Sequence, residues 1–356
     1  MNKQNLFKGC LFCGAVGDAL GYAVEFMSLN RIKDRFGESG ITEPVLDKAA
    51  NKALISDDTQ MTLFTADGLL WAAVSRGAGE VNYAADGVYP SYLRWYYTQS
   101  GYIGDRRLLE KQPHEKENAV FPAGESILEF KELFACRAPG STCTSSLRSG
   151  EMGAIENPLN DSKGCGGVMR AAPAGLLLHR DPAAAFRAGA ESAAITHGHP
   201  CGYLPAGALA AIVAELVGGK TISDSAQTAM QILATYPQHE ETLAAMRQAV
   251  NLAAGSMAPE DAIRALGEGW VGEEALAIAL YCALKKTDVK AALIAAVNHD
   301  GDSDSTGAVC GNILGAAYGF GALPKDWAEN IELHELLTDM SDKLFALSQH
   351  LNVKSL

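Results

Sequence analysis

The chain has 356 residues, of which 48% are hydrophobic, 20% charged and 7% aromatic. This composition excludes a disordered chain, and the length suits one large domain or two of ordinary size. The formal net charge of −13 argues against general binding to a nucleic-acid backbone or an anionic membrane. Any phosphorylated ligand must therefore be held locally, by metal ions and backbone N–H groups.

The N-terminal segment only faintly resembles a secretion signal. An apolar run follows Lys3 and Lys8, but Asp18 and Glu25 cut it short and no convincing cleavage site follows. We find no uncharged apolar window of about 18 residues, the minimum for a membrane-spanning helix. These features predict a cytoplasmic protein without a membrane span.

The N-terminal half is expected to contain two long helices separated by irregular chain. Residues 6–27 form a buried helical pattern broken by glycines, and residues 28–55 are expected to be loop. A second helix begins at Asp57 and Asp58, because acidic side chains suit a first turn, where backbone N–H groups are free. Asp67 falls inside the apolar stripe of that helix, which predicts that its carboxylate is paired or belongs to a site.

Residues 77–165 are the least regular part of the sequence. Helical patterns are expected over residues 92–97 and 125–134. Residues 137–148 and 157–167 are expected to be loops, and the second loop leads into a helix from Val168.

The remainder predicts one helix after another. Asp181 followed by Pro182 is typical of a cap and a first helical position. Apolar stripes at helical spacing cover residues 209–217, 289–297 and 333–347, while residues 309–320 are apolar nearly all round and should lie at the centre of the fold. Because alternating strand patterns and linkers are scarce, we expect one all-α domain over residues 1–356.

The eight cysteines are spread along the chain, mostly in apolar surroundings typical of free thiols. Cys10 and Cys13 form a C-x-x-C pair without a second pair to complete a zinc site, so buried structural thiols are favoured. His197 and His199 lie two residues apart, but no suitably spaced Cys or third His follows. A hydrogen-bonding or helix-end role is favoured over metal ligation for both.

The acidic run Asp300-Gly-Asp-Ser-Asp304 is the strongest candidate for a site. Side chains two residues apart can point the same way, and this density of negative charge favours a bound cation. With the cluster after Ser56, the run offers oxygen ligands at Ser56, Asp57, Asp58, Asp302, Asp304 and Ser305. Oxygen ligands favour Mg²⁺, Mn²⁺ or Ca²⁺ over zinc, although helix capping accounts equally well for each cluster.

Three further pattern matches fail on their context. Residues 300–304 begin like an EF-hand loop, but Ser305 and Gly311 stand where Gly and Glu are required. The tripeptide Gly219-Lys-Thr221 ends like a phosphate-binding loop that lacks its first glycine. Gly267-x-Gly269-x-x-Gly272 fits a dinucleotide fingerprint but joins two predicted helices instead of following a strand.

Several short segments together resemble the ADP-ribosylglycohydrolase family. In family order they are Gly17-Asp-Ala-Leu-Gly21 with Glu25, Ser56-Asp-Asp-Thr-Gln60, Arg137-Ala-Pro-Gly140, Gly164-Cys-Gly-Gly-Val-Met-Arg170, Thr196-His-Gly-His-Pro200 with Gly202-Tyr203, and Gly301-Asp-Ser-Asp-Ser-Thr306. Each is weak alone, but the set covers nearly the whole chain and is highly specific. The inserted region around residues 77–136 matches less clearly.

The resemblance implies an all-α fold with a dinuclear Mg²⁺ (or Mn²⁺) centre in a cleft. It places metal ligands at Ser56, Asp57, Asp58, Asp302, Asp304 and Ser305. It places ADP-ribose contacts at Gly164, Cys165, Gly166, Gly167, Met169, Arg170, His197 and Tyr203. Glu25 is expected near the scissile ribose, and Asp300 is expected outside the ligand set.

The activity that the resemblance implies is metal-dependent hydrolysis of the N-glycosidic bond between ADP-ribose and a protein arginine. The pair Asp302-Ser-Asp304-Ser305 looks more like the arginine-directed members than those with Asp-Thr-Asp-Thr. The catalytic carboxylates expected are Asp58, Glu25 and Asp57. The expected partners are ADP-ribose and ADP-ribosylated protein, without nucleic acid or membrane. Two alternatives stay open: another ADP-ribosyl linkage, such as an O-linked serine adduct or a small ester, and a binding protein that neutralises an ADP-ribosylating toxin.

Overall fold

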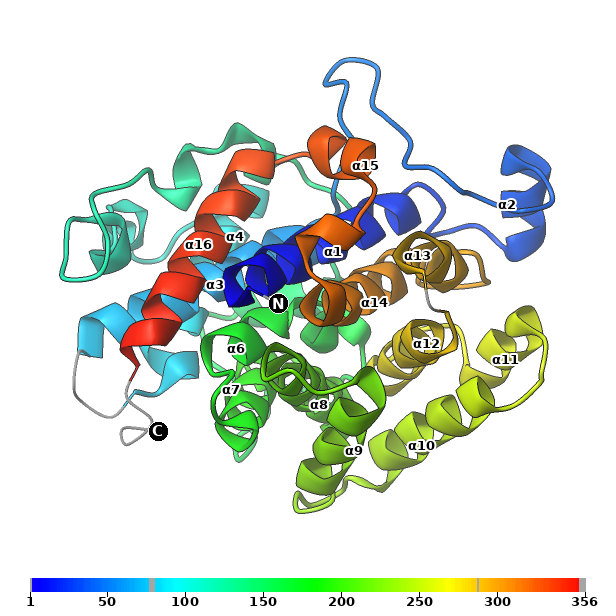
Figure 1. Ribbon diagram of the computed structural model, residues 1–356. Helices are drawn as coiled ribbons and strands as arrows, with labels where there is room; N and C mark the ends of the chain where they lie inside the picture. Colours follow the sequence, from blue (N-terminus) through cyan, green and yellow to red (C-terminus); the bar gives the residue numbers. More distant parts are fainter. Residues whose placement is uncertain (1, 77–80, 287, 352–356) are drawn as a thin grey trace.

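The computed structural model describes residues 2–76, 81–286 and 288–351 (Figure 1). Within these ranges the chain forms sixteen α-helices and no β-strand, with three isolated bridges such as Gly164 to Val271. The prediction of an all-α fold is therefore confirmed.

The helices of the N-terminal half and the middle of the chain are α1 (Lys3–Tyr22), α2 (Leu29–Phe36), α3 (Asp57–Arg76), α4 (Tyr89–Ser100), α5 (Ser141–Arg148), α6 (Ala172–Leu177), α7 (Pro182–Ala194) and α8 (Pro200–Val217). The later helices are α9 (Ile222–Leu233), α10 (Glu240–Ala254), α11 (Pro259–Leu266), α12 (Gly272–Lys285), α13 (Val289–Val297), α14 (Ser303–Tyr318), α15 (Lys325–Asn330) and α16 (His334–His350). A π-helical turn and short 3-10 turns occupy the connections: Ala84–Val88, Arg106–Leu109, Pro113–Glu115, Ile127–Glu129, Lys131–Phe134, Cys165–Arg170 and Phe320–Ala322.

Helices α1 and α14 pack along each other at the centre of the molecule (Figure 1). Glycines permit the close approach: a Cβ on Gly17 would lie 2.0 Å from the carbonyl oxygen of Gly307, and one on Gly21 would lie 2.2 Å from that of Ser303. Non-bonded contacts of real Cβ atoms are almost never shorter than 3.0 Å, so neither position accepts a larger residue without movement. The packing brings the end of α1 against the start of α14. As predicted, α14 is buried, from Ser303 to Ala316.

Helix α8 is the one helix among the described residues that is long and apolar enough to cross a membrane, with a mean hydropathy of 1.5. It is, however, 94% buried inside the protein, where it packs against α7 and α9. A core helix meets the same length and composition criteria as a membrane span, so this feature alone is weak support for one.

Most expected helices are present, but four local predictions were wrong. The α-helix expected from Val168 is instead a 3-10 turn over Cys165–Arg170, and α6 begins at Ala172. Residues 28–55 contain α2, where Ser28 caps a short segment with only Leu29 and Ile32 buried, too brief a pattern to detect. The expected loop over residues 137–148 contains α5, whose Ser- and Thr-rich sequence has weak helix propensity. The expected helix over residues 125–134 is instead two 3-10 turns.

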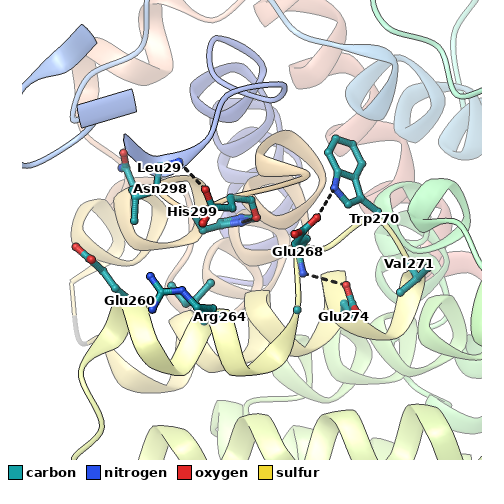
Figure 2. Close-up of a pocket in the computed structure, with 12 residues that line it drawn as sticks. Leu29, Glu260, Arg264, Glu268, Trp270, Val271, Glu274, Asn298 and His299 are labelled. Atoms are coloured by element: carbon teal, nitrogen blue, oxygen red, sulfur yellow. Dashed lines mark hydrogen bonds between the residues drawn. The ribbon is translucent and has the colours of Figure 1, made fainter. Parts of the chain in front are cut away.

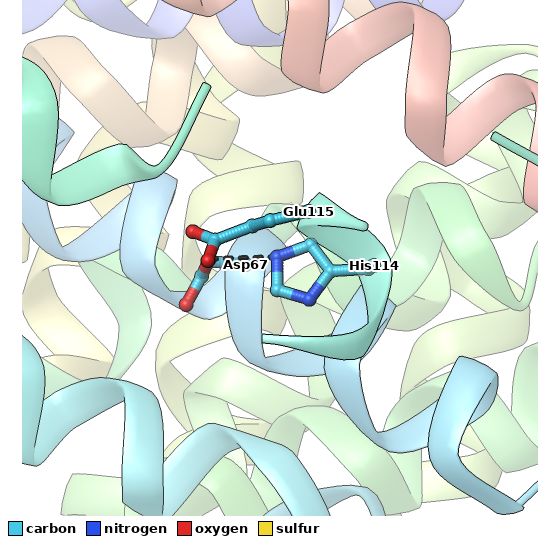
Figure 3. Close-up of side chains that lie close together, drawn as sticks. All are labelled: Asp67, His114 and Glu115. Carbon is cyan, nitrogen blue, oxygen red and sulfur yellow. Dashed lines mark hydrogen bonds and ion pairs between the residues drawn. The ribbon is translucent and has the colours of Figure 1, made fainter. Parts of the chain in front are cut away.

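The buried carboxylate of Asp67 is paired, as predicted (Figure 3). The Arg94 guanidinium lies 2.9 Å from Asp67 and 2.8 Å from Glu115, and Nε2 of His114 lies 2.8 Å from Oδ1 of Asp67. Burial alone would raise the pKa of Asp67, but Arg94 and His114 hold it well below its usual range. Although Asp67, His114 and Glu115 lie close enough to share a metal ion, Arg94 already supplies the cation.

Candidate metal centre

A cavity of about 400 Å³ lies where the end of α1, the starts of α3 and α14 and the Gly164–Arg170 segment meet. Its acidic and hydroxyl lining consists of Glu25, Asp57, Asp58, Ser141, Thr142, Asp302, Asp304 and Ser305. The other lining residues are Phe26, Ala138, Pro139, Gly140, Cys143, Gly164, Cys165, Gly166, Met169, His197 and Trp270. The cavity therefore brings together both acidic clusters and the Gly-rich segment, three parts of the chain that lie far apart in the sequence.

Three of the carboxylates converge closely. One oxygen from each of Glu25, Asp302 and Asp304 lies within 4.8 Å of the others, so the three can hold one metal ion. Asp57 and Asp58 face the same cavity from the first turn of α3. Glu25, which we expected near the scissile ribose, thus also lies within the range of a metal ligand.

Two carboxylate oxygens in this cavity are buried without a hydrogen-bond partner: Oδ2 of Asp58 and Oε2 of Glu25. The residues are only 3% and 7% exposed. None of the described residues that line the cavity is a lysine or an arginine. Because buried negative charge is costly unless it is paired or bound to a metal, the donor set fits a hard divalent cation.

Four of these carboxylates have raised pKa values for the same reason. Burial, followed by the charges of Asp304, Asp302 and Asp57, raises the pKa of Glu25 to about 10. Burial and Asp304 likewise raise the pKa values of Asp57, Asp58 and Asp302 well above the usual range. Repulsion between these groups therefore favours protons in the absence of a cation, and a bound cation would favour their ionised forms.

The first acidic cluster is positioned by Asp18, which sequence analysis gave no role in the site. Its carboxylate accepts the N–H groups of Ser56 and Thr59, each at 3.0 Å, and the Thr59 hydroxyl at 2.5 Å. The Ser56 hydroxyl in turn accepts the Asp58 N–H at 3.2 Å and does not line the cavity. Ser56 therefore acts here as a helix cap. An acidic residue inside the apolar pattern of α1 was the sequence signal that could have identified Asp18, which is fully buried in the structure.

A short loop before α5 forms the wall beside Asp57. Its Gly140 N–H donates to Oδ2 of Asp57 at 3.2 Å, and the Arg137 carbonyl accepts the Asp57 N–H at 3.2 Å. The Arg137 guanidinium pairs with Glu332, which precedes α16. Ala138, which lies between Arg137 and Gly140 in this loop, has a φ of 52°. This left-handed conformation is uncommon for alanine and is often found at functional sites.

The second acidic cluster forms the start of α14. Asp302 caps the helix by accepting the Ser305 N–H at 3.4 Å, and Oδ1 of Asp304 accepts the same N–H at 2.9 Å. Asp300 instead accepts the Leu29 N–H at 2.8 Å, at the start of α2. It does not line the cavity, in agreement with its expected place outside the ligand set.

The expected ADP-ribose-binding residues divide into two groups. Gly164, Cys165, Gly166, Met169 and His197 line the cavity, whereas Gly167, Arg170 and Tyr203 do not. The N–H groups of Gly164 and Cys165 are already bonded, to the Ser162 hydroxyl and the Trp270 carbonyl respectively. These two N–H groups therefore already have acceptors within the protein.

Arg170 lies beneath the Gly-rich segment and is 1% exposed. Its guanidinium donates to the Thr196 hydroxyl at 2.6 Å and packs on the Tyr92 ring, 4.3 Å from the ring centroid. Thr196 also contacts Nδ1 of His197 at 2.8 Å, and burial lowers the pKa of His197 to about 3. Arg170 thus supports a neutral His197, whose Nε2 faces Gly164 and Gly166. His199 caps α8 by accepting the Cys201 N–H, as expected of a helix-end residue.

Two aromatic residues at the cavity were missed by the sequence analysis. The rings of Phe26 and Trp270 stack with centroids 6.0 Å apart, and the residues are 68% and 39% exposed. Trp270 also borders a neighbouring cavity of about 610 Å³, where its indole N–H donates to Glu268 at 3.2 Å (Figure 2). Glu274, on α12, accepts the N–H of Gly269 in the same loop as Trp270. The loop joining α11 and α12 thereby holds Trp270 at the edge of both cavities.

Comparisons with known proteins show which family and which fold the chain resembles. The sequence model of a family described as ADP-ribosylglycohydrolase matches residues 1–353. The chain is 27% identical to an uncharacterized protein of Archaeoglobus fulgidus over 97% of both chains. It is 24% identical to the ADP-ribosyl-(dinitrogen reductase) glycohydrolase of Rhodospirillum rubrum, over 90% of this chain and 87% of that protein.

Further matches extend the likeness to other species and to a solved structure. The chain is 24% identical to ADP-ribosylarginine hydrolase Tri1 of Pseudomonas putida, over 95% of this chain and 77% of that protein. A solved structure titled ADP-ribosylglycohydrolase-related protein complex has a TM-score of 0.64 and 22% identity, over 97% of this chain and 99% of the other. At that identity the structural match shows a shared fold.

Proposed function

This chain belongs to the ADP-ribosylglycohydrolase family, and we propose that it is a metal-dependent hydrolase that releases ADP-ribose from arginine side chains of proteins. The observation that carries the proposal is the meeting of both acidic clusters in one buried cavity beside the Gly-rich segment. Arginine as the acceptor is supported by the Asp302-Ser-Asp304-Ser305 sequence and by the name of the Pseudomonas putida relative.

The proposed cofactor is a pair of Mg²⁺ ions, with Mn²⁺ as a substitute. Oxygen-only donors and two unpartnered buried carboxylate oxygens fit such ions. The residues expected to hold them are Ser56, Asp57, Asp58, Asp302, Asp304 and Ser305. All of these but Ser56, whose hydroxyl accepts the Asp58 N–H, line the cavity, and Glu25 is within reach. When bound, such ions would coordinate ribose hydroxyls and lower the pKa of a water molecule.

Hydrolysis requires breaking the bond between ribose C1 and the guanidinium nitrogen, adding a water oxygen to C1 and giving a proton to the departing nitrogen. Asp58 and Glu25 each retain an oxygen that no described protein group occupies. Whichever of these carboxylates the metal ions leave free is placed to accept the proton of water and to return one to the leaving group. Asp57 is held by the Gly140 N–H, which limits its rotation and suits it to ligation. Phe26 and Trp270 line the cavity as a stacked pair of aromatic rings.

The partners in this proposal are ADP-ribose and ADP-ribosylated protein. The described cysteines are free thiols, seven of them buried or half-buried, which suits the reducing environment of the cytoplasm. The negative net charge supports a protein substrate over a nucleic acid.

The test is to incubate the purified protein with an arginine-ADP-ribosylated protein and to measure free ADP-ribose, with Mg²⁺ and with a chelator. Release that requires Mg²⁺ is expected from the wild type and from Asp300→Ala, and loss of release from the Asp302→Ala, Asp304→Ala double variant. Release by the double variant would contradict the metal mechanism. Faster release from a serine-linked substrate would favour the other linkage, and tight binding without release from either substrate would favour a binding protein.

A further inference from the structure

Cys165 lies where the Gly-rich segment meets the second acidic cluster. Its thiol donates to Oδ2 of Asp302 at 2.7 Å, and its backbone N–H donates to the Trp270 carbonyl at 3.2 Å. The Asp302 N–H donates to the Glu268 carbonyl at 2.8 Å. The residues between α11 and α12 therefore connect Cys165 to Asp302 through the backbone, while the thiol connects them directly.

The thiol bond determines how Asp302 is oriented. The other carboxylate oxygen of Asp302 receives only the long Ser305 N–H bond of 3.4 Å, which restrains rotation of the carboxylate weakly. Each oxygen of Asp302 accepts one of these two bonds and keeps a further lone pair, and Asp302 lines the cavity. The cavity carries independent signs of a ligand, because the buried Asp58 Oδ2 and Glu25 Oε2 have no partner in the described protein.

We propose that Cys165 is a positioning residue that couples the metal centre to the ADP-ribose-binding segment through its thiol bond to Asp302. This inference rests on the function proposed above. The thiol holds Asp302 in the orientation that binds the ion, and the ion-bound carboxylate in turn holds the segment Gly164–Gly167 in place beside His197. Because coupling between two binding sites is reciprocal, metal then strengthens ADP-ribose binding, and ADP-ribose strengthens metal binding by the same factor.

Removing the thiol is expected to weaken both effects. A hydrogen bond to a charged group contributes enough that Cys165→Ala should bind Mn²⁺ on the order of tenfold more weakly. The factor by which Mn²⁺ improves ADP-ribose binding should fall in the same variant. Cys165→Ser retains a hydroxyl donor of similar reach and should restore both quantities most of the way to the wild-type values.

The experiment is isothermal titration calorimetry of the purified full-length variants with Mn²⁺ alone, with ADP-ribose alone, and with ADP-ribose in saturating Mn²⁺. The matched control is Cys201→Ala, which removes another thiol that donates to a carboxylate, Glu241 at 3.0 Å, outside the cavity. This control is expected to bind Mn²⁺ as the wild type does. Thermal unfolding of each metal-free variant checks that the fold is retained.

The outcomes separate this inference from the function on which it rests. Wild-type Mn²⁺ affinity and coupling in Cys165→Ala would overturn the role of Cys165 while leaving the proposed hydrolase intact. Equal losses in Cys165→Ala and Cys165→Ser would also overturn it, since the sulfur itself rather than its bond to Asp302 would then matter. A wild-type protein that binds neither Mn²⁺ nor ADP-ribose would overturn the proposed function together with this inference.

Discussion

The carboxylate of Asp18 accepts the backbone N–H of Ser56 through both of its oxygens, at 3.0 and 3.1 Å. Asp18 lies on α1, so this contact ties the start of α3 to the central helix. Three residues further along the same helix, Gly21 lies against the Ser303 carbonyl at the start of α14. One helix therefore sets the positions of both acidic clusters, and the geometry of the metal centre depends on how α1 packs.

Replacing Asp18 is expected to weaken metal binding, although Asp18 is not among the expected ligands. Asp18→Ala leaves the N–H groups of Ser56 and Thr59 buried without an acceptor, at a cost of roughly 1–3 kcal/mol for each group. Asp18→Asn keeps one acceptor oxygen and should lie between alanine and wild type. Urea unfolding in chelator measures the loss of stability, and Mn²⁺ titration measures the loss of affinity. Wild-type behaviour of Asp18→Ala in both assays would contradict the positioning role.

Adding a methyl group where α1 and α14 touch should also lower the stability of the protein. A Cβ on Gly17 would lie 2.0 Å from the Gly307 carbonyl, so Gly17→Ala must separate the helices, at a cost of about 1–3 kcal/mol or more. The matched control is Gly321→Ala, where nothing lies within 4 Å of the added methyl group. Thermal unfolding should show a lower Tm for Gly17→Ala and little change for the control. Equal Tm values for the two variants would show that this contact is not restrictive.

The raised carboxylate pKa values predict how the stability of the metal-free protein depends on pH. Burial and Asp304 raise the pKa of Asp18 to about 7, and burial raises that of Glu25 to about 10. An unfolded carboxyl titrates near pH 4, so the folded state binds more protons above that pH. The stability contributed by these groups is fully present below about pH 4 and is lost as pH rises through about 7 for Asp18 and about 10 for Glu25.

Chemical unfolding of the metal-free protein between pH 5 and pH 9 (roughly the span in which these groups titrate) should therefore show falling stability. Saturating Mn²⁺ should reverse the trend, because the ionised carboxylates bind the ion. Glu25→Gln removes one titrating group and should flatten the fall in chelator. A slope that is unchanged in Glu25→Gln would show that Glu25 does not titrate as its surroundings indicate.

The buried ion network around Arg94 is expected to stabilise the irregular chain that precedes α5. Arg94→Met leaves the carboxylates of Asp67 and Glu115 buried without their cation, at a cost of about 3–5 kcal/mol. The matched control is Arg107→Met, which removes an exposed pair with Asp105 and should change the stability little, because solvent screens exposed charges. Urea unfolding of both variants measures the difference. A similar small effect in both would contradict a structural role for the network.

Much of the fold could be predicted because its signals are local. The apolar pattern of α14 indicated its central place, Asp181 and Pro182 marked the start of α7, and scarce strand patterns indicated the all-α class. Helix α5 escaped prediction because its Ser and Thr residues favour helix weakly. Its Ser146 hydroxyl donates to the Thr196 carbonyl, a contact between residues distant in the sequence.

The sequence by itself determined which residue types the site contains. Carboxylates two apart, or in a first helical turn, were enough to identify Asp57, Asp58, Asp302 and Asp304 as candidate ligands, and the family resemblance put them into one site. These inferences need only local spacing, since a side chain's direction follows from its position in a helix or turn.

Only the tertiary structure decided which side chains share the cavity. It brought Glu25 into range of Asp302 and Asp304, and it placed Arg170 beneath the Gly-rich segment instead of in the cavity. It also placed the Asp300 carboxylate at the start of α2 and the Cys165 thiol against the Asp302 carboxylate. The physical reason is that these contacts depend on how α1 and α14 pack. Glycines recur at every fourth residue of α14 (Gly307, Gly311 and Gly315), but that spacing does not say which helix packs against them.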